Sequence, residues 1–404
     1  MRSRLPIAVA ALALLTAACG VGGESIDAAG DGVGATSTTA QSTTPSVTID
    51  PEAEVASALR DMRDPSFPPP LVDPAEIISG GPPPDGIPPI DDPQFITVWE
   101  ADEWLDEAEP VVYLEINGEV HAYPAQIMIW HEIVNDTVGG VPVTVTYCPL
   151  CNSAVSYHRE VAGEVTTFGT SGRLFASALV MYDRLTESLW THFDGRAVVG
   201  ALTGAALEPI PSPLLAWSDF KKAFPEAMVL DRSATGFSRP YGENPYFGYD
   251  DETTTPFLFR GTVDDRAAAK QRVVGVVIDD LARAFSLDFL SVGEASATNT
   301  EVGETPIVIL WKAGQASALD ETEISDGRDV GSAAVFSPLV DGERLTFVAD
   351  SGEFRDEQTA SLWDITGTAV SGELAGTTLE QIHHLDTFWF AWSTYQPDTD
   401  LVDG

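Results

Sequence analysis

The chain has 404 residues, of which 44% are apolar, 62 are acidic and 21 are basic, so its formal net charge is −41. This length and apolar content are enough for two or three domains with substantial cores. So acidic a surface repels phosphate backbones, which argues against nucleic acid as a partner. It could attract cations loosely, which is compatible with metal use.

Residues 1–18 are typical of an export signal, because Arg2 and Arg4 precede an apolar stretch that is too short to span a bilayer. The run LTAACG at 15–20 resembles a bacterial lipobox, in which Cys19 becomes the lipidated first residue. An ordinary signal peptide with an incidental cysteine is the alternative. We therefore expect an extracytoplasmic protein, anchored to the bacterial cell membrane by a lipid on Cys19. Any protein or small-molecule partner is left open by the sequence.

The next segments have the composition of a tether. Residues 19–64 are rich in Ser, Thr and Gly, and we expect them to be disordered because they carry few large apolar side chains. Residues 65–94 are rich in proline and are expected to lie extended across the surface of the body. The globular body should begin near Phe95, and no later segment is apolar enough to span a membrane.

The body contains an internal repeat, in which four segments recur in the same order. The matched ranges are 112–126 with 274–288, 141–147 with 305–311, 172–182 with 327–337, and 188–210 with 361–382. We predict two tandem, internally duplicated β-rich modules packed together, a first at 95–245 and a degenerate second at 246–404. Alternating apolar residues and Gly, Asn and Asp turns predict a mainly β fold with few short helices. Helical signals are few, at 125–132 and 218–224.

The only CxxC pair lies in the first module. Alternating apolar residues at 141–147 lead to Cys148, and after Cys151 a second alternating run, 154–157, leads away. This pattern predicts a β-hairpin with both thiols at its turn. The second module keeps the strand at 305–311 but has no cysteine, so the fold does not require the thiols.

Three interpretations of the CPLC pair remain open. Two thiolates at this spacing suit a transition metal, zinc or copper. A redox dithiol is the second interpretation, since CPLC resembles the CPxC of glutaredoxin-like proteins, although those place the first cysteine before a helix and Asn152 to Tyr157 has the pattern of a strand. The third is a structural disulfide, which is plausible outside the cytoplasm.

A metal would need ligands from distant sequence. His131, just before the hairpin, is the best candidate, with a buried histidine bonded to backbone as its alternative. Glu132 or Asp183 would be a fourth ligand or support the ligands, and His158 would be a supporting partner. His192 is expected to be structural or solvent-facing. Ligation would place a histidine nitrogen about 3.5–4 Å from a sulfur.

Several motifs carry a family resemblance: HEIVND, TYCPLC, MYDR, ESLW and RPYGENPYFGYDD. With these motifs the chain closely resembles the domain of unknown function 3179 family, from about Asp92 to Pro397. The resemblance implies no activity.

We therefore expect an exported, membrane-anchored lipoprotein with a transition-metal-binding or redox site at the CPLC motif. A thiol-disulfide oxidoreductase is one alternative, and a non-catalytic binding module with a structural disulfide is another. The sequence does not decide whether the protein is an enzyme.

Overall fold

The computed structural model describes residues 56–404. The predicted signal peptide, Cys19 and most of the predicted tether lie outside this range. The mainly β class is confirmed, because short strands dominate and the helices have only four to seven residues. Within 56–404, no helix is both long and apolar enough to cross a membrane.

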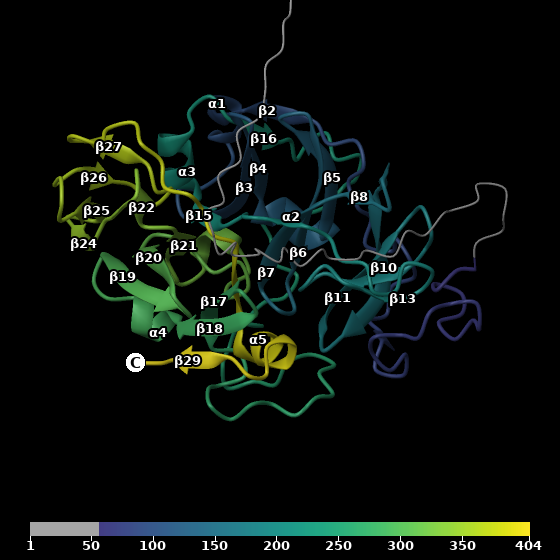
Figure 1. The fold of residues 1–404 in the computed structure, drawn as a ribbon. Coiled ribbons are helices and arrows are strands. Elements are labelled where there is room, and N and C mark those ends of the chain that lie inside the picture. The colour runs from purple at the N-terminus through teal and green to yellow at the C-terminus, as the bar shows by residue number, and fades with distance from the viewer. Residues whose placement is uncertain (1–55) are drawn as a thin grey trace, which may run out of the picture. The chain divides into compact units, whose positions relative to one another are not determined.

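The first half of the body forms three sheets and a small hairpin (Figure 1). The sheets have the strand orders β15-β3-β4-β16-β2, β14-β7-β6-β5 and β1-β10-β11-β12-β13, and the hairpin is β8-β9. The elements are β1 (Ile78–Ser79), β2 (Phe95–Thr97), α1 (Val98–Ala101), β3 (Pro110–Ile116), β4 (Glu119–Pro124), α2 (Ala125–His131), β5 (Ile133–Val138), β6 (Val141–Cys148), β7 (Ser153–His158), β8 (Glu160–Val161), β9 (Glu164–Val165), β10 (Phe168–Phe175), β11 (Ala178–Asp183), β12 (Leu189–Thr191), β13 (Ala197–Val199), β14 (Pro209–Ile210), β15 (Leu214–Ala216), α3 (Trp217–Ala223) and β16 (Met228–Leu230). The two helices expected from the sequence are therefore present as α2 and α3.

The second half repeats this order of pairings: β28-β17-β18-β29, β19-β20-β21, β24-β25-β26-β27, and the hairpin β22-β23. Its elements are β17 (Arg272–Ile278), β18 (Leu281–Ser286), α4 (Leu287–Leu290), β19 (Ala295–Val302), β20 (Thr305–Lys312), η1 (Ile324–Asp326), β21 (Ser332–Phe336), β22 (Leu339–Val340), β23 (Glu343–Arg344), β24 (Phe347–Asp350), β25 (Glu353–Asp356), β26 (Leu362–Trp363), β27 (Ala369–Ser371), β28 (His384–Phe388), α5 (Trp389–Tyr395) and β29 (Asp400–Val402). A parallel pairing of two strands also recurs, β16 with β4 and β29 with β18.

Two hydrogen-bonded motifs recur at equivalent places in the halves. In the first, an aspartate that ends a strand accepts bonds from the following turn and, at 2.9 Å, from a tryptophan indole. Its members are Asp183, Thr186, Ser188 and Trp190 in one half, and Asp356, Thr359, Ser361 and Trp363 in the other. In the second, an asparagine amide bonds both backbone groups of a phenylalanine, as Asn135 with Phe168 and Asn299 with Phe347. These shared motifs support the predicted duplication.

One matched segment of the sequence repeat pairs different elements of the halves. Residues 172–182 include most of β11, whereas 327–337 include β21. By its place in the sheet, β21 is equivalent to β7, because β21 lies beside β20 and β7 lies beside β6. The strand equivalent to β11 is β25 instead. Runs of small apolar residues look alike in any half-buried strand, so they align readily with the wrong partner.

The chain before the first module packs against it. Ala58 and Ile77 are buried in one cluster with residues of β11, β12 and β13. β1, within the proline-rich segment, pairs with the edge of β10. Packed structure thus begins within the segment expected to be a disordered tether.

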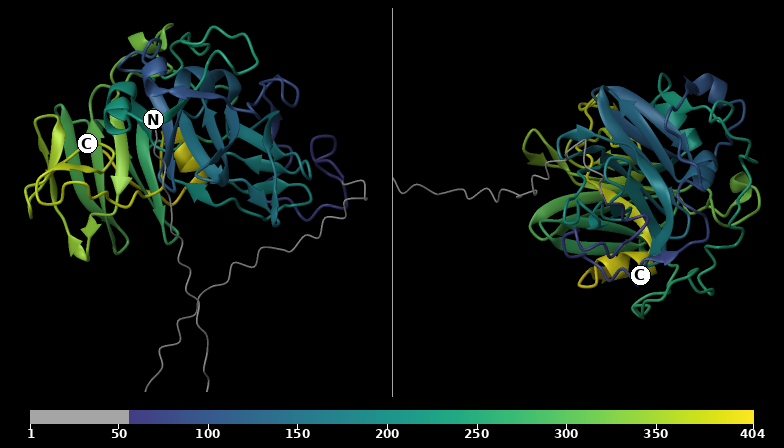
Figure 2. Two further views of the ribbon diagram at one scale, coloured as in Figure 1. Left: turned by 90° about the horizontal axis from the view of Figure 1, so that it is seen from above. Right: turned by 90° about the vertical axis from the view of Figure 1, so that its right-hand side faces the viewer.

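The halves lie side by side in two perpendicular views (Figures 1 and 2). They share a core cluster that contains Cys148 and Cys151 together with Phe388 and Trp389. The segment 231–271, which has no helix or strand, connects them. The thiols therefore lie where the two halves meet.

Candidate functional site

The two thiols lie at the turn of the predicted hairpin. β6 ends at Cys148, β7 begins at Ser153, and these two residues are paired across the strands. The turn closes through the Asn152 amide, which donates to the Pro149 carbonyl at 3.3 Å, and Asn152 has a left-handed φ of 50°. Cys148 is 1% exposed and Cys151 is fully buried. Both are unpaired thiols in this structure.

The histidine beside the thiols is His192, which follows β12. Its Nε2 lies 3.7 Å from Cys151 Sγ. One ligand atom from each of Cys148, Cys151 and His192 lies within 4.8 Å of the other two, so the three residues could hold a metal ion. A separation of 3.7 Å falls within the range of about 3.5–4 Å expected for two ligands of one metal.

Thr146 sets the tautomer of His192. The Thr146 hydroxyl donates to the Val155 carbonyl at 2.7 Å, so its oxygen accepts from His192 Nδ1 at 2.8 Å. Because Nδ1 then carries the proton, the lone pair of Nε2 points toward the thiols. Complete burial lowers the pKa of His192 to about 3, which keeps the ring neutral and able to act as a ligand.

Ser153 completes the polar set. Its hydroxyl lies 2.9 Å from both His192 Nε2 and Cys151 Sγ. A hydroxyl can donate one bond and accept others, so Ser153 can donate to the unprotonated Nε2 and accept from the Cys151 thiol at the same time. Without a metal, Ser153 can therefore connect the imidazole to the Cys151 sulfur.

The two thiols differ in acidity. Burial raises the pKa of Cys148, but hydrogen bonds from the Cys151 thiol and from the backbone amides of Leu179, Cys151 and Leu150 outweigh it, so that pKa lies below its usual value. Burial and the hydrogen bond to Cys148 raise the pKa of Cys151. Cys148 is therefore the first of the pair to become a thiolate, which is the form that binds metal or attacks an electrophile.

The predicted ligand His131 lies elsewhere. Its Nδ1 donates to the Pro88 carbonyl at 2.7 Å, and its Nε2 lies 2.7 Å from the Tyr241 hydroxyl. Burial lowers the pKa of His131 and favours the neutral ring, whose Nε2 can accept from the Tyr241 hydroxyl. His131 therefore tethers the proline-rich segment and the connection between the halves, as in the alternative interpretation of a buried, backbone-bonded histidine.

The predicted supporting residues divide into two kinds. Asp183 is fully buried, and its bonds to the turn and to Trp190 hold the β11–β12 connection. His158 ends β7, and its backbone amide donates to the Glu208 carbonyl. Glu132 lies near the thiols: burial and then the charge of Cys148 raise the pKa of its carboxyl well above the usual value. Of the three, Glu132 is the one placed to influence Cys148.

The second half shows which residues the fold itself does not need. Because Asn135 pairs with Thr144 and Asn299 with Val308, β6 and β20 can be compared position by position. Thr146 then corresponds to Leu310, Cys148 to Lys312 and, two residues after the shared tryptophans, His192 to Ile365. Leu310 and Ile365 are buried in apolar core. The alignment of the two SLW segments places His192 at the position of Ile365. This replacement of an apolar residue by a histidine was the available sequence signal for His192.

The second half also braces the CPLC turn. The Cys151 carbonyl accepts from the Thr387 hydroxyl at 2.7 Å and from the Phe388 amide at 3.1 Å. The Leu150 carbonyl accepts from the Tyr249 hydroxyl, in the connection, at 3.1 Å. The turn is thus held from outside its own module.

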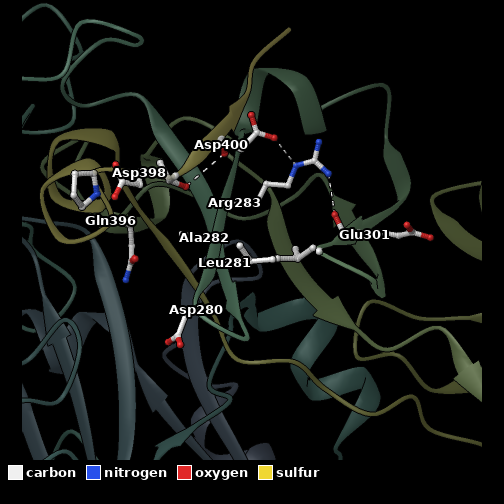
Figure 3. Close-up of a pocket in the computed structure, with 12 residues that line it drawn as sticks. Asp280, Leu281, Ala282, Arg283, Glu301, Gln396, Asp398 and Asp400 are labelled. Atoms are coloured by element: carbon white, nitrogen blue, oxygen red, sulfur yellow. Dashed lines mark hydrogen bonds and ion pairs between the residues drawn. The ribbon is translucent and has the colours of Figure 1, made fainter.

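A cavity of about 650 Å³ belongs to the second half and includes none of the thiol site (Figure 3). Its one basic side chain, Arg283, pairs with Asp400 at 3.0 Å and donates to the Glu301 carbonyl at 2.9 Å. Asp280 and Asp398 add further negative charge. Because Arg283 is already paired, this cavity is a weaker candidate for the functional site than the thiol site.

Fold and site together define a mainly β protein with a buried Cys–Cys–His group braced by two similar halves. The chain belongs to the family described as "Protein of unknown function (DUF3179)", which matches residues 84–399. No curated protein and no solved structure gives a significant match.

Proposed function

We propose that the protein binds one soft transition-metal ion through Cys148, Cys151 and His192. The observation that carries the proposal is the convergence of three ligand atoms within 4.8 Å of one another, with the imidazole held in the ligand tautomer by Thr146. Two thiolates and a neutral imidazole favour soft and borderline ions over Mg²⁺ or Ca²⁺.

Cu(I) fits this donor set better than Zn²⁺. A structural zinc site takes four protein ligands, whereas the group formed by the described residues has three, and soft thiolates select Cu(I). Burial of the sulfurs would protect a bound Cu(I) from water and oxidants. The predicted export signal, and the resemblance of residues 15–20 to a lipobox, support a position outside the cell membrane, where the protein would carry copper or pass electrons.

The test is the metal content of full-length protein purified under reducing conditions and loaded with Cu(I) or Zn²⁺. About one copper per chain is expected, lost in Cys148→Ser, Cys151→Ser and His192→Ala. His131→Gln is the matched control, since it removes a buried histidine from a different place and should keep the metal. Full copper binding by His192→Ala would refute the site, and a preference for zinc would refute the choice of metal.

A thiol-disulfide oxidoreductase is the second candidate, favoured by the unequal acidity of the thiols. Such an enzyme attacks a substrate disulfide with the thiolate, forms a mixed disulfide and releases it through the second cysteine. Burial of both sulfurs argues against a protein substrate. Trapping of a mixed disulfide by Cys151→Ser protein, together with the absence of bound metal in the wild type, would favour this function instead.

A further inference from the structure

A cavity of about 210 Å³ lies beside the CPLC turn. Three of its lining residues lie beside the thiols. Leu150 lies within the turn, and the Leu179 backbone amide donates to Cys148. The Glu132 carboxyl is close enough to Cys148 for the charge of Cys148 to raise its pKa. Its volume is below the usual range of about 300–1,000 Å³ for ligand pockets. The cavity therefore suits a molecule the size of one ring.

Two aromatic residues line the cavity, and hydrogen bonds fix the backbone of one of them, Phe257. Tyr246 and Phe257 come from the connection between the halves. The Phe257 amide donates to the Tyr249 hydroxyl at 3.1 Å, and the Phe257 carbonyl accepts from the Ser177 hydroxyl. Two such rings favour an aromatic ligand, which packs against them by offset or edge contacts.

Glu132 supplies the polar group. Its residue is only 7% exposed, and no group within 56–404 forms a hydrogen bond with its carboxyl. By contrast, the nearby His131, Asn135 and Asp136 are all hydrogen-bonded through their side chains. Buried polar groups are nearly always paired, so an unpaired carboxyl at a cavity wall indicates a missing partner.

Glu132 also has an unusual backbone conformation, with a φ of +59°. The residue ends α2 in the left-handed conformation, which few residues with a side chain adopt. The preceding residue, His131, bonds to Pro88 and Tyr241, whereas Glu132 lines the cavity. Such strain is often kept where a side chain has a functional position.

We propose that this cavity binds a small uncharged phenol, with its ring between Tyr246 and Phe257 and its hydroxyl bonded to Glu132. A phenolic hydroxyl can donate to a carboxyl oxygen in either protonation state of that group. The other charged wall residue, Arg173, already donates to the Leu59 carbonyl at 3.2 Å. Binding does not require a metal, and only the ligand's position beside a copper ion rests on the proposed function.

The test is calorimetric titration of full-length, reduced, metal-free protein with p-cresol. Saturable one-to-one binding is expected, and toluene, which has the same ring without the hydroxyl, should bind at least about tenfold more weakly. Glu132→Leu should weaken p-cresol binding by a similar factor, whereas Glu132→Gln, which can still bond to a hydroxyl, should stay within about threefold. Ile87→Trp, which fills the cavity from its wall, should abolish binding.

Phe257→Ala and Phe247→Ala form a matched pair. Both remove an exposed phenylalanine from the same connection, but only Phe257 lines the cavity, so only its loss should weaken binding. The absence of saturable binding, or equal binding by wild type and Glu132→Leu, would overturn the proposal. Copper content measured on the same proteins distinguishes the two proposals. If the cavity proposal is wrong, copper should still bind, and if the metal proposal is wrong, p-cresol should still bind.

Discussion

At the scale of single residues, Thr146 decides whether His192 can act as a ligand. Thr146→Val keeps the shape of the side chain but removes the acceptor for Nδ1–H, so the imidazole loses its fixed tautomer. We expect Cu(I) affinity to fall about 10- to 100-fold, as is typical when a partner of a ligating histidine is lost. Competition with a chelator of known copper affinity measures the change.

Thr144 provides the control for this prediction. It lies on the same strand and is fully buried, and its hydroxyl has no hydrogen-bond partner in the described chain. Thr144→Val should therefore leave copper affinity unchanged and should not lower stability. Equal effects of the two substitutions would show that Thr146 acts through packing alone.

His192 should also make stability depend on pH. Its pKa is about 3 in the folded protein and near 6.5 when unfolded, so between these values the unfolded chain binds the extra proton. The contribution of the neutral ring to the free energy of unfolding is fully present above about pH 6.5. It is lost as the pH falls toward 3. The expected slope is about 1.4 kcal/mol of unfolding free energy per pH unit.

The second half supplies the comparison for this measurement. Thr146→Leu with His192→Ile places there the apolar pair that Leu310 and Ile365 form in the other half. Urea unfolding of both metal-free proteins from pH 4 to pH 7 should show the slope in the wild type and a smaller one in the double variant. Titration of His131 and His383 is common to both, so parallel curves would contradict the assignment to His192.

At the scale of elements, the CPLC turn depends on β28. Thr387→Val removes the hydroxyl that donates to the Cys151 carbonyl, and we expect a loss of about 1 kcal/mol in unfolding free energy together with weaker copper binding. Thr394→Val removes a hydroxyl that donates to the Phe390 carbonyl within α5, so it should affect copper binding little. Denaturant unfolding and copper competition on both variants check the difference.

At the scale of the whole molecule, the site joins two halves that share a core. Copper that binds only the folded state should stabilise both halves together, by about 2.7 kcal/mol at a free concentration 100 times Kd. Calorimetry should then show the whole transition moving upward with copper in the wild type. Cys148→Ser should show no shift, and a shift confined to part of the transition would contradict the coupling.

Much of this architecture could be predicted from local patterns. Alternating apolar residues and turn residues indicated a mainly β fold, the hairpin with Cys148 and Cys151 at its turn, and the short helices α2 and α3. The repeat also indicated that the fold can exist without thiols. These features follow from periodicity over a few residues, which the sequence displays directly.

The histidine of the Cys–Cys–His group and the cavity were decided only by tertiary structure. His131 and Glu132 are neighbours in sequence, but a left-handed residue at the end of α2 places Glu132 near the thiols while His131 is bonded to Pro88 and Tyr241. His192 reaches Cys151 from 41 residues away because sheets bring distant strands together. The sequence by itself determined the fold class, the family and the thiol pair. The packing of sheets against one another decided which histidine and which carboxylate stand beside that pair, because such contacts leave no local pattern along the chain.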